Sequence, residues 1–132
     1  APTLEDVDQL VEDMRSIGLP VTFAVEGAPS TVQRGVQMSA YRIIQEALTN
    51  VVKHAGRTSA VEVRLVYVPD RLVVEVSDDG RGLAADGAPE DPGHGIIGMR
   101  ERVEVWGGRL DAGPRPGGGF VVRAELPLEG SS

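Results

Sequence analysis

Two consecutive segments with strict two-residue periodicity constrain the fold of this chain most strongly. Residues 61–65 and 72–76 each place an apolar side chain at every second position, which is typical of half-buried β-strands. Between these segments lies Pro69-Asp70, a pair that favours a tight turn. The sequence therefore predicts an antiparallel β-hairpin, with one face of each strand turned toward a hydrophobic core.

Around this hairpin the sequence predicts three helices and three further strands. The helices are expected over residues 3–17, 30–55 and 96–106, and the strands over residues 21–25, 109–112 and 120–126. Helices and hairpin strands alternate without a regular βαβ repeat. We therefore expect an α+β fold, a two-layer α/β sandwich in which helices cover one face of a mixed, largely antiparallel sheet.

Composition limits the classes of function. The 132 residues fit one domain, and a hydrophobic fraction of 41% is enough for one core. A net charge of -7 argues against a general binder of nucleic-acid backbones. The chain has no cysteine, which excludes disulfides and thiolate metal sites, and no apolar run approaches the roughly 20 residues of a membrane helix.

A polar stripe runs along the longest predicted helix. Glu46, Asn50 and Lys53 share one face at i, i+4 and i+7, and His54 lies beside them. The opposite face is apolar and carries Ile44, Leu48, Val51 and Ala55. The stripe is either a solvated face, as most amphipathic helices have, or the wall of a cleft. In a cleft, the Glu could polarise a nucleophile and the Asn could offer an amide oxygen to Mg²⁺, while Lys or His could meet phosphate.

The end of the second hairpin strand carries an unusual carboxylate. Asp78 shares the face of the apolar side chains of 72–78, so it should point inward. A buried carboxylate needs a hydrogen-bond donor, which could be a nucleobase amine, a local backbone amide or an arginine. Asp79-Gly80 is also a common turn pair, and Gly80 and Gly82 would let the backbone approach a planar ligand.

Two further glycine-rich segments are ambiguous by themselves. Residues 93–98 match G-x-G-x-x-G, but no apolar strand precedes them, which argues against a dinucleotide-binding fingerprint. They are either a flexible loop before a helix or a phosphate-binding helix N-terminus. Gly117-Gly118-Gly119 is either a loose hairpin connection or a close approach of the backbone to a ligand.

The order of these four segments resembles the Bergerat-type ATPases over roughly residues 19–128. That superfamily includes gyrase, the ninety-kilodalton heat-shock chaperone, mismatch-repair ATPases and bacterial histidine kinases. Residues 41–55 resemble the N box of histidine kinases, and residues 95–103 resemble their second glycine box. Residues 98–102, Gly-Met-Arg-Glu-Arg, resemble the subgroup that signals to NarL-type response regulators. The third glycine box departs from the pattern, because Phe120 stands where a Thr is common.

The resemblance implies a site for ATP and Mg²⁺. Asp78 would accept a hydrogen bond from the adenine amino group, and Asn50 would bind Mg²⁺. Glu46 would act near the γ-phosphate as base or positioning group and is a second candidate for the metal. Lys53 and His54 would contact phosphates. The remaining positions implied at the pocket and its lid are Gly80, Gly82, Gly93, His94, Gly95, Ile96, Gly98, Met99, Gly118 and Gly119.

The resemblance also implies transfer of the ATP γ-phosphoryl group to a histidine on a dimerisation domain. The two histidines of this chain, His54 and His94, lie within nucleotide boxes. We therefore expect residues 1–18 to be a linker helix from a missing phosphoacceptor domain, 19–128 the catalytic domain and 129–132 a polar tail. Such a fragment should bind ATP without phosphorylating itself.

The expected partners are the missing phosphoacceptor domain and a response regulator with a helix-turn-helix output domain. Nucleic acid and direct membrane contact are not expected. The domain should be cytoplasmic, in a parent protein that is either membrane-bound or soluble. Two alternatives remain, a stand-alone serine kinase of the anti-sigma type and a non-catalytic nucleotide-binding module.

Overall fold

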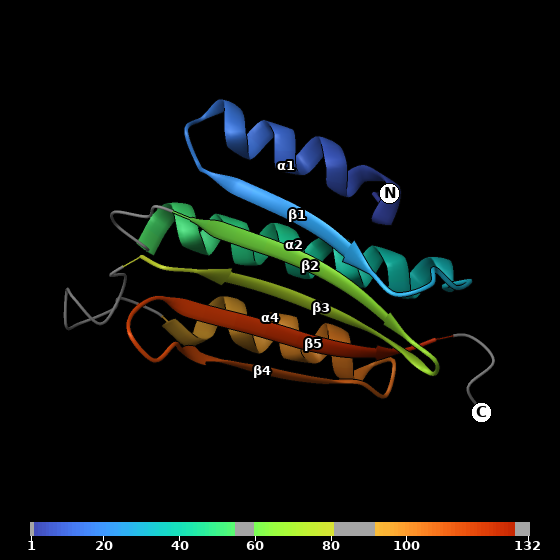
Figure 1. Ribbon diagram of the computed structural model, residues 1–132. Helices are drawn as coiled ribbons and strands as arrows, with labels where there is room; N and C mark the ends of the chain where they lie inside the picture. The colour runs from blue at the N-terminus through green and yellow to red at the C-terminus, as the bar shows by residue number, and fades with distance from the viewer. Residues whose placement is uncertain (1, 55–59, 81–91, 129–132) are drawn as a thin grey trace.

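The computed structural model describes residues 2–54, 60–80 and 92–128, which form two layers (Figure 1). The first layer is a five-stranded sheet in the order β1-β2-β3-β5-β4. Its strands are β1 (Val21–Glu26), β2 (Val61–Val68), β3 (Arg71–Asp78), β4 (Arg109–Pro114) and β5 (Phe120–Pro127). The second layer consists of η1 (Leu4–Asp6), α1 (Val7–Ser16), α2 (Arg34–His54) and α4 (Pro92–Glu104).

The sheet is mixed and largely antiparallel, which confirms the expected fold class. β2 and β3 form the predicted hairpin, with Val61 opposite Asp78 at one end and Val68 opposite Arg71 at the turn. β1 pairs with β2 in parallel, while β5 pairs antiparallel with both β3 and β4. α2 and α4 lie on one face of this sheet, and α1 lies along the β1 edge (Figure 1).

The core forms between the helices and the apolar face of the strands. The alternating residues of β2, β3 and β5 turn this face inward, and Val61, Val63, Leu72, Val74 and Leu126 are almost completely buried. α2 contributes Ile44, Leu48 and Val51, as its apolar stripe predicts. Burying each such side chain stabilises the fold by roughly 1.5–3 kcal/mol.

The longest helix is buried on a wider arc than the sequence pattern indicates. α2 begins at Arg34, four residues after the predicted start. Ile43 is 0% and Ala47 is 2% exposed, although neither belongs to the predicted apolar stripe. The wider arc arises because α2 contacts η1, α1 and α4 as well as β3 and β5. Ala55, the last residue of the predicted stripe, lies outside the described residues.

The prediction that the next helix begins at Ile96 and ends at Trp106 is wrong. α4 begins at Pro92 and ends at Glu104, so Gly93, His94 and Gly95 are helical and do not belong to a loop. Pro is well suited to a first helical turn, since its φ angle is already helical and its missing N–H has no helical partner to lose. Trp106 follows the helix and donates its Nε1–H to Ser39 Oγ of α2 at 2.9 Å.

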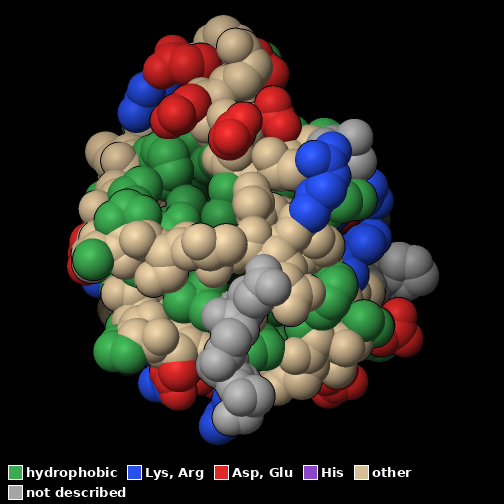
Figure 2. Space-filling model, turned by 90° about the vertical axis from the view of Figure 1, so that its right-hand side faces the viewer, with side chains coloured by type: hydrophobic (Ala, Val, Ile, Leu, Met, Phe, Trp, Pro, Cys, Tyr) green, Lys and Arg blue, Asp and Glu red, His purple; other side chains and the backbone are tan. Residues whose placement is uncertain are grey.

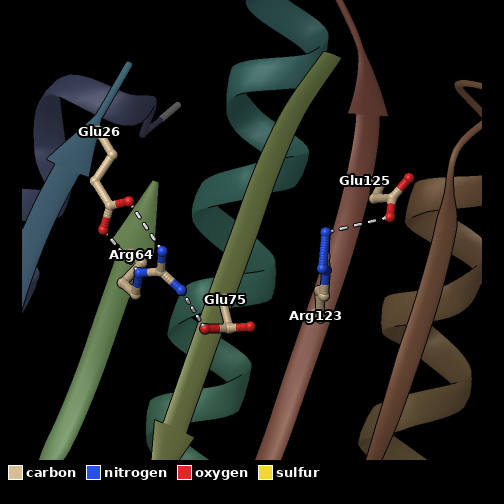
Figure 3. Close-up of polar contacts among 5 residues, drawn as sticks. All are labelled: Glu26, Arg64, Glu75, Arg123 and Glu125. Atoms are coloured by element: carbon tan, nitrogen blue, oxygen red, sulfur yellow. Dashed lines mark hydrogen bonds and ion pairs between the residues drawn. The ribbon is translucent and has the colours of Figure 1, made fainter. Parts of the chain in front are cut away.

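The sheet face opposite the helices carries charged side chains in cross-strand rows (Figure 3). Arg64 of β2 donates to both carboxylate oxygens of Glu26 and to Glu75 of β3, each at 2.9 Å. These bonds raise the pKa of Arg64, and the Arg64 hydrogen bonds lower the pKa of Glu26. Arg123 and Glu125 of β5 form a looser pair at 3.5 Å. This face is therefore largely polar, although Val73 on it is also buried, and the main hydrophobic core lies on the helix side.

Within the described residues, no helix is both long and apolar enough to cross a membrane.

The turn between β4 and β5 approaches the end of β3 closely. Gly117, Gly118 and Gly119 all have positive φ angles, of 88°, 122° and 96°. A Cβ atom at Gly119 would lie 1.9 Å from the carbonyl oxygen of Asp78, whereas one at Gly117 would meet no atom within 4 Å. Gly119 is therefore required both by its backbone conformation and by contact, and Gly117 by conformation alone.

We expect Gly119→Ala to lower the free energy of unfolding by about 2–5 kcal/mol, since left-handed strain adds to a backbone clash. Gly117→Ala is the matched control and should cost only about 1–2 kcal/mol from strain. Urea denaturation of the two variants beside the parent chain measures the difference. Equal losses would show that Gly119 is not packed against Asp78.

Candidate functional site

Four elements meet at one end of the sheet (Figure 1). They are the C-terminal half of α2, the end of β3, the first turn of α4 and the turn between β4 and β5. Two contacts tie them together. Gly119 lies against the backbone of Asp78, and Gly95 of α4 lies against Glu46 and Asn50 of α2. Segments that are far apart in the sequence thus form a single site region.

Asp78 is the central carboxylate of this region. Its side chain is buried, with 4% of the residue exposed, as the phase of the strand predicts. The backbone N–H of Gly80 donates to its Oδ1 at 2.7 Å. Across residues 2–54, 60–80 and 92–128, no donor is present on the other carboxylate oxygen, Oδ2. The local backbone amide, one of the donors that the sequence left open, is therefore in place on Oδ1, and the described residues leave Oδ2 to accept a further bond.

The neighbouring Asp79 has a different role. It is exposed, its Oδ1 accepts the N–H of Ala60 at 3.0 Å, and its own N–H donates to the Ala60 carbonyl at 3.2 Å. These bonds extend the contact between the ends of β2 and β3. The strand phase therefore separated the two adjacent carboxylates correctly, into an inward Asp78 and an outward Asp79.

The environment of Asp78 opposes its ionisation. Burial raises the pKa of its carboxyl above the ordinary value, and the nearby charge of Asp79 adds to this effect. The Gly80 N–H and the positive charge of Arg115 act in the opposite direction and lower the pKa, but burial dominates. A hydrogen bond donated by a ligand would therefore stabilise the ionised form of this carboxyl.

Arg115 is a residue of this region that the sequence reasoning missed. It lies in the turn between β4 and β5, and its Nη1 donates to the carbonyl oxygen of Asp78 at 2.9 Å. The turn is closed by the Arg115 N–H, which donates to the Gly119 carbonyl at 2.9 Å. Nothing in the local sequence pattern marks this arginine, because its partner is 37 residues away.

The polar stripe of α2 faces the first turn of α4. Glu46 and Asn50 are half-buried, and a Cβ atom at Gly95 would lie 2.9 Å from Glu46 Oε2 and 3.3 Å from Asn50 Nδ2. These two residues of the stripe therefore face α4 and are only partly exposed to solvent. Gly95 has no side chain because Glu46 occupies the space where one would lie.

The other candidate residues differ in how far they are exposed to solvent. Lys53 is exposed on α2, and Gly98 has open space around it. Met99 is 1% exposed and Ile96 packs partly against the core, so the core accounts for both side chains. Gly118 lies in the β4–β5 turn beside Gly119.

Three candidates are described through their backbone alone, and one is not described. The backbones of His54, Gly93 and His94 are helical, in α2 and α4, and their side chains fall outside the described part. Gly82 lies outside the described residues.

The assembled groups suit a ligand that has a planar ring with an amino group together with an anionic group or a bound metal. Asp78 offers a buried acceptor, and the start of α4 offers the partial positive charge of a helix N-terminus. Asn50 and Glu46 offer oxygens of the kind that Mg²⁺ prefers. In the described part of the chain, no three His, Cys, Asp or Glu residues cluster to hold a metal.

Comparison with known proteins agrees with this arrangement. Residues 35–130 match the family described as histidine kinase-, DNA gyrase B-, and HSP90-like ATPases. The chain belongs to this family, as the four glycine and asparagine boxes predict. Its similarity to sensor histidine kinases then identifies it, within the family, as an ATP-binding catalytic domain of the sensor histidine kinase type.

The similar proteins include three named kinases. The chain is 32% identical to sensor histidine kinase LnrJ of Bacillus subtilis over 127 residues, which are 95% of this chain and 30% of LnrJ. It is 30% identical to oxygen sensor histidine kinase NreB of Staphylococcus carnosus, covering 86% of this chain and 33% of NreB. It is 37% identical to sensor histidine kinase NarS of Mycobacterium tuberculosis, covering 74% of this chain and 23% of NarS. The chain therefore spans about a third or less of these relatives.

A solved structure shares the fold. The histidine kinase domain of the Erythrobacter litoralis EL346 blue-light activated histidine kinase superimposes with a TM-score of 0.70 at 24% identity. The match covers 95% of this chain and 60% of that one.

We expect Asp78→Asn to stabilise the ligand-free domain at neutral pH. Because the folded-state pKa is raised above the unfolded value, stability falls as the pH rises from the unfolded pKa to the folded pKa, and the loss is complete above the folded pKa. The amide removes that loss while keeping an oxygen for the Gly80 N–H. The gain should be about 0.5–2 kcal/mol, the usual size for a stabilising substitution.

The pH dependence tests the cause. As the pH falls through the raised pKa of Asp78 toward its unfolded value, the parent chain regains this stability and the two chains should converge. Thermal unfolding between neutral and acidic pH measures both curves, with Asp111→Asn on the exposed part of β4 as the control of equal charge change. A variant that is less stable than the parent at every pH would contradict the account.

Proposed function

We propose that this domain binds Mg²⁺-ATP at the end of the sheet and, within its parent protein, supplies the phosphoryl group that is transferred to a histidine of a dimerisation domain. The single observation that carries the proposal is the buried carboxylate of Asp78, which has one oxygen bonded to Gly80 and one able to accept a bond. The nucleotide, rather than any single loop, is what would connect the four elements of the site.

In this proposal the adenine amino group donates to Asp78, and the backbone at Gly80 and Gly119 allows the planar base to approach. Gly119 already lies against Asp78, and a side chain there would displace the turn. Arg115 of the same turn also holds the Asp78 main chain, through its bond to the Asp78 carbonyl oxygen. Arg115 is thus a positioning residue, since it acts through Asp78.

The phosphates would lie toward the start of α4 and the polar stripe of α2. Asn50 would offer its amide oxygen to Mg²⁺, and Glu46 would position or activate groups near the γ-phosphate, or bind the metal as a second ligand. Mg²⁺ is usually held by one or two protein oxygens together with substrate phosphates, and the Glu46–Asn50 pair fits that requirement. When bound, the metal would neutralise charge that develops on the transferring phosphoryl group.

Lys53, His54 and His94 remain proposed contacts of the phosphates or the lid, together with Gly82 and Gly93. Lys53 is exposed at the end of α2 and can reach a bound anion. Ile96, Gly98 and Met99 would form the wall next to the nucleotide. Gly98 has open space above it, while Ile96 and Met99 support that wall from the core.

The partners are proposed from the relatives, which are sensor histidine kinases. The phosphoryl acceptor would be a histidine of a dimerisation domain, and a response regulator would then receive the group. A regulator with a helix-turn-helix output domain is the finer proposal, which rests on residues 98–102.

Titration calorimetry with ATP tests the nucleotide site. Asp78→Asn should weaken binding by about ten-fold or more, because a charge-assisted hydrogen bond contributes roughly 1.5–3 kcal/mol. Asp111→Asn, with the same change of charge away from the site, should bind as the parent does. Unchanged affinity of Asp78→Asn would remove Asp78 from the site. The result is especially informative because the same variant is expected to be more stable without ligand.

The metal role of Asn50 has a separate readout. Asn50→Ala should lose more affinity for ATP with Mg²⁺ than for ATP with excess chelator, because only the first complex uses the amide oxygen. Equal losses in the two titrations would assign Asn50 to the nucleotide alone.

Phosphotransfer requires the parent protein with its acceptor domain. In that protein Glu46→Gln should slow phosphorylation by about 10²–10⁴ if Glu46 is a general base. A small change in rate would instead assign it a positioning role. The isolated 132-residue chain should bind ATP and acquire no acid-labile label.

A further inference from the structure

An apolar groove lies at the end of the domain opposite the site. It has a volume of about 420 Å³ and is formed by residues from η1, α1, β1, the start of α2 and β2. Its lining residues are Leu4, Glu5, Asp8, Phe23, Val25, Pro29, Ser30, Thr31, Val32, Gln37, Leu65 and Tyr67. Figure 2 views this end of the molecule and shows green apolar side chains in a hollow beneath red acidic ones.

The groove is remote from the nucleotide region. β2 runs from Val61, which is paired with Asp78, to Tyr67, which lines the groove. Six residues of strand separate these ends by about 20 Å. A molecule in the groove would therefore leave the Asp78 end of the sheet accessible.

The walls of the groove are held in place before any ligand arrives. Gly27 has a φ of 84°, and a Cβ atom there would lie 2.2 Å from the Tyr67 carbonyl oxygen, so the loop after β1 lies directly on β2. Gln37 of α2 donates its Nε2–H to the Val32 carbonyl at 3.0 Å, which fixes the other end of that loop. A preformed groove needs little ordering on binding, which favours affinity.

Part of the apolar lining faces solvent. Val25 is 51% exposed at the edge strand β1, while Leu65 at 3% and Val32 at 8% form the buried floor. The desolvation of Tyr67 raises the pKa of its hydroxyl, which agrees with its position in an apolar wall. An apolar side chain entering the groove would remove Val25 and its neighbours from water.

The charge of the lining is one-sided. Glu5 and Asp8 are its charged residues, three positions apart on η1 and α1, and none of the described lining residues is Lys or Arg. The nearby Glu26 is different, because Arg64 already neutralises it. Within residues 2–54, 60–80 and 92–128, neither Glu5 nor Asp8 forms an ion pair with Lys or Arg, so the two acids at the rim complement a cation, and the apolar floor complements an aliphatic side chain.

We infer that this groove docks a basic amphipathic helix of a partner protein. One or two aliphatic side chains of the helix pack against Val25 and over the floor formed by Leu65 and Val32. Lys or Arg side chains one turn away pair with Glu5 and Asp8. This is the helix-in-groove mode of recognition, in which residues at i and i+3 or i+4 act as anchors. The inference does not depend on nucleotide binding, so it stands or falls separately from the proposed function.

The test is an NMR titration of the isotope-labelled 132-residue chain. The probe is a helical peptide of about 15 residues, long enough to fold, with Leu on one face and Lys on the other. Saturable shifts should be confined to backbone amides of the groove, including Val25, Ser30 and Tyr67. A peptide of the same pattern with Glu in place of Lys should bind at least ten-fold more weakly.

Paired variants distinguish binding in the groove from nonspecific electrostatic attraction between a basic peptide and this acidic chain. Glu5→Gln with Asp8→Asn should weaken the Leu/Lys peptide about three- to ten-fold, the loss expected for two rim ion pairs. The control pair Glu12→Gln with Asp13→Asn makes the same charge change on α1 outside the groove and should have little effect. Likewise Val25→Ser should weaken binding, whereas Val52→Ser, which is 48% exposed on α2, should not.

Three results of the peptide experiments would overturn the inference, and a fourth comes from the chain without peptide. They are equal losses in the groove and control pairs, shifts that map to another surface, and equal binding of the Glu peptide. Concentration-dependent shifts of the same groove amides without any peptide would also overturn it, because the occupant would then be a second copy of this chain.

Discussion

The close approach of the β4–β5 turn to the end of β3 is the contact on which the candidate site depends. Gly119 touches the Asp78 backbone, and Arg115 from the same turn donates to the Asp78 carbonyl at 2.9 Å. These contacts fix the position from which the Asp78 side chain enters the interior. The strand phase turns the carboxylate inward, and burial raises its pKa and opposes its charge.

The site therefore combines a rigid framework with an unfavourable group. The sheet, the core and the turn hold Asp78 where a ligand can reach one of its oxygens. In the ligand-free domain, the buried ionised carboxylate lowers the stability of the fold. Such a conflict between folding and binding is expected at functional sites. The contact between Gly95 and the Glu46–Asn50 pair follows the same logic, because a glycine inside a helix weakens the helix and makes room for polar groups.

The two ends of the sheet have different characters. The Asp78 end gathers polar groups and glycines from four elements, whereas the Tyr67 end is an apolar groove with an acidic rim. The paired strands β1 and β2 run from one end to the other. Charged side chains on the sheet face opposite the helices expose this face to solvent (Figure 3). A domain of this design can hold a small molecule at one end and a protein segment at the other.

The sequence by itself determined the hairpin, the inward direction of Asp78, the apolar arc of α2 at Ile44, Leu48 and Val51, and the family. These follow from periodicity and from short motifs, which are local properties. Local patterns also misplaced the start of α4. Glycines and a proline are typical of a loop, so the sequence predicted a start at Ile96, whereas in the structure the helix begins at Pro92 and Gly95 packs on Glu46. Only the tertiary structure decided that Arg115 supports Asp78, that Ile43 and Ala47 are buried, and that η1, β1 and β2 enclose a groove. Each of those contacts joins residues that are distant in the chain, and the geometry of such contacts is set by how the layers pack.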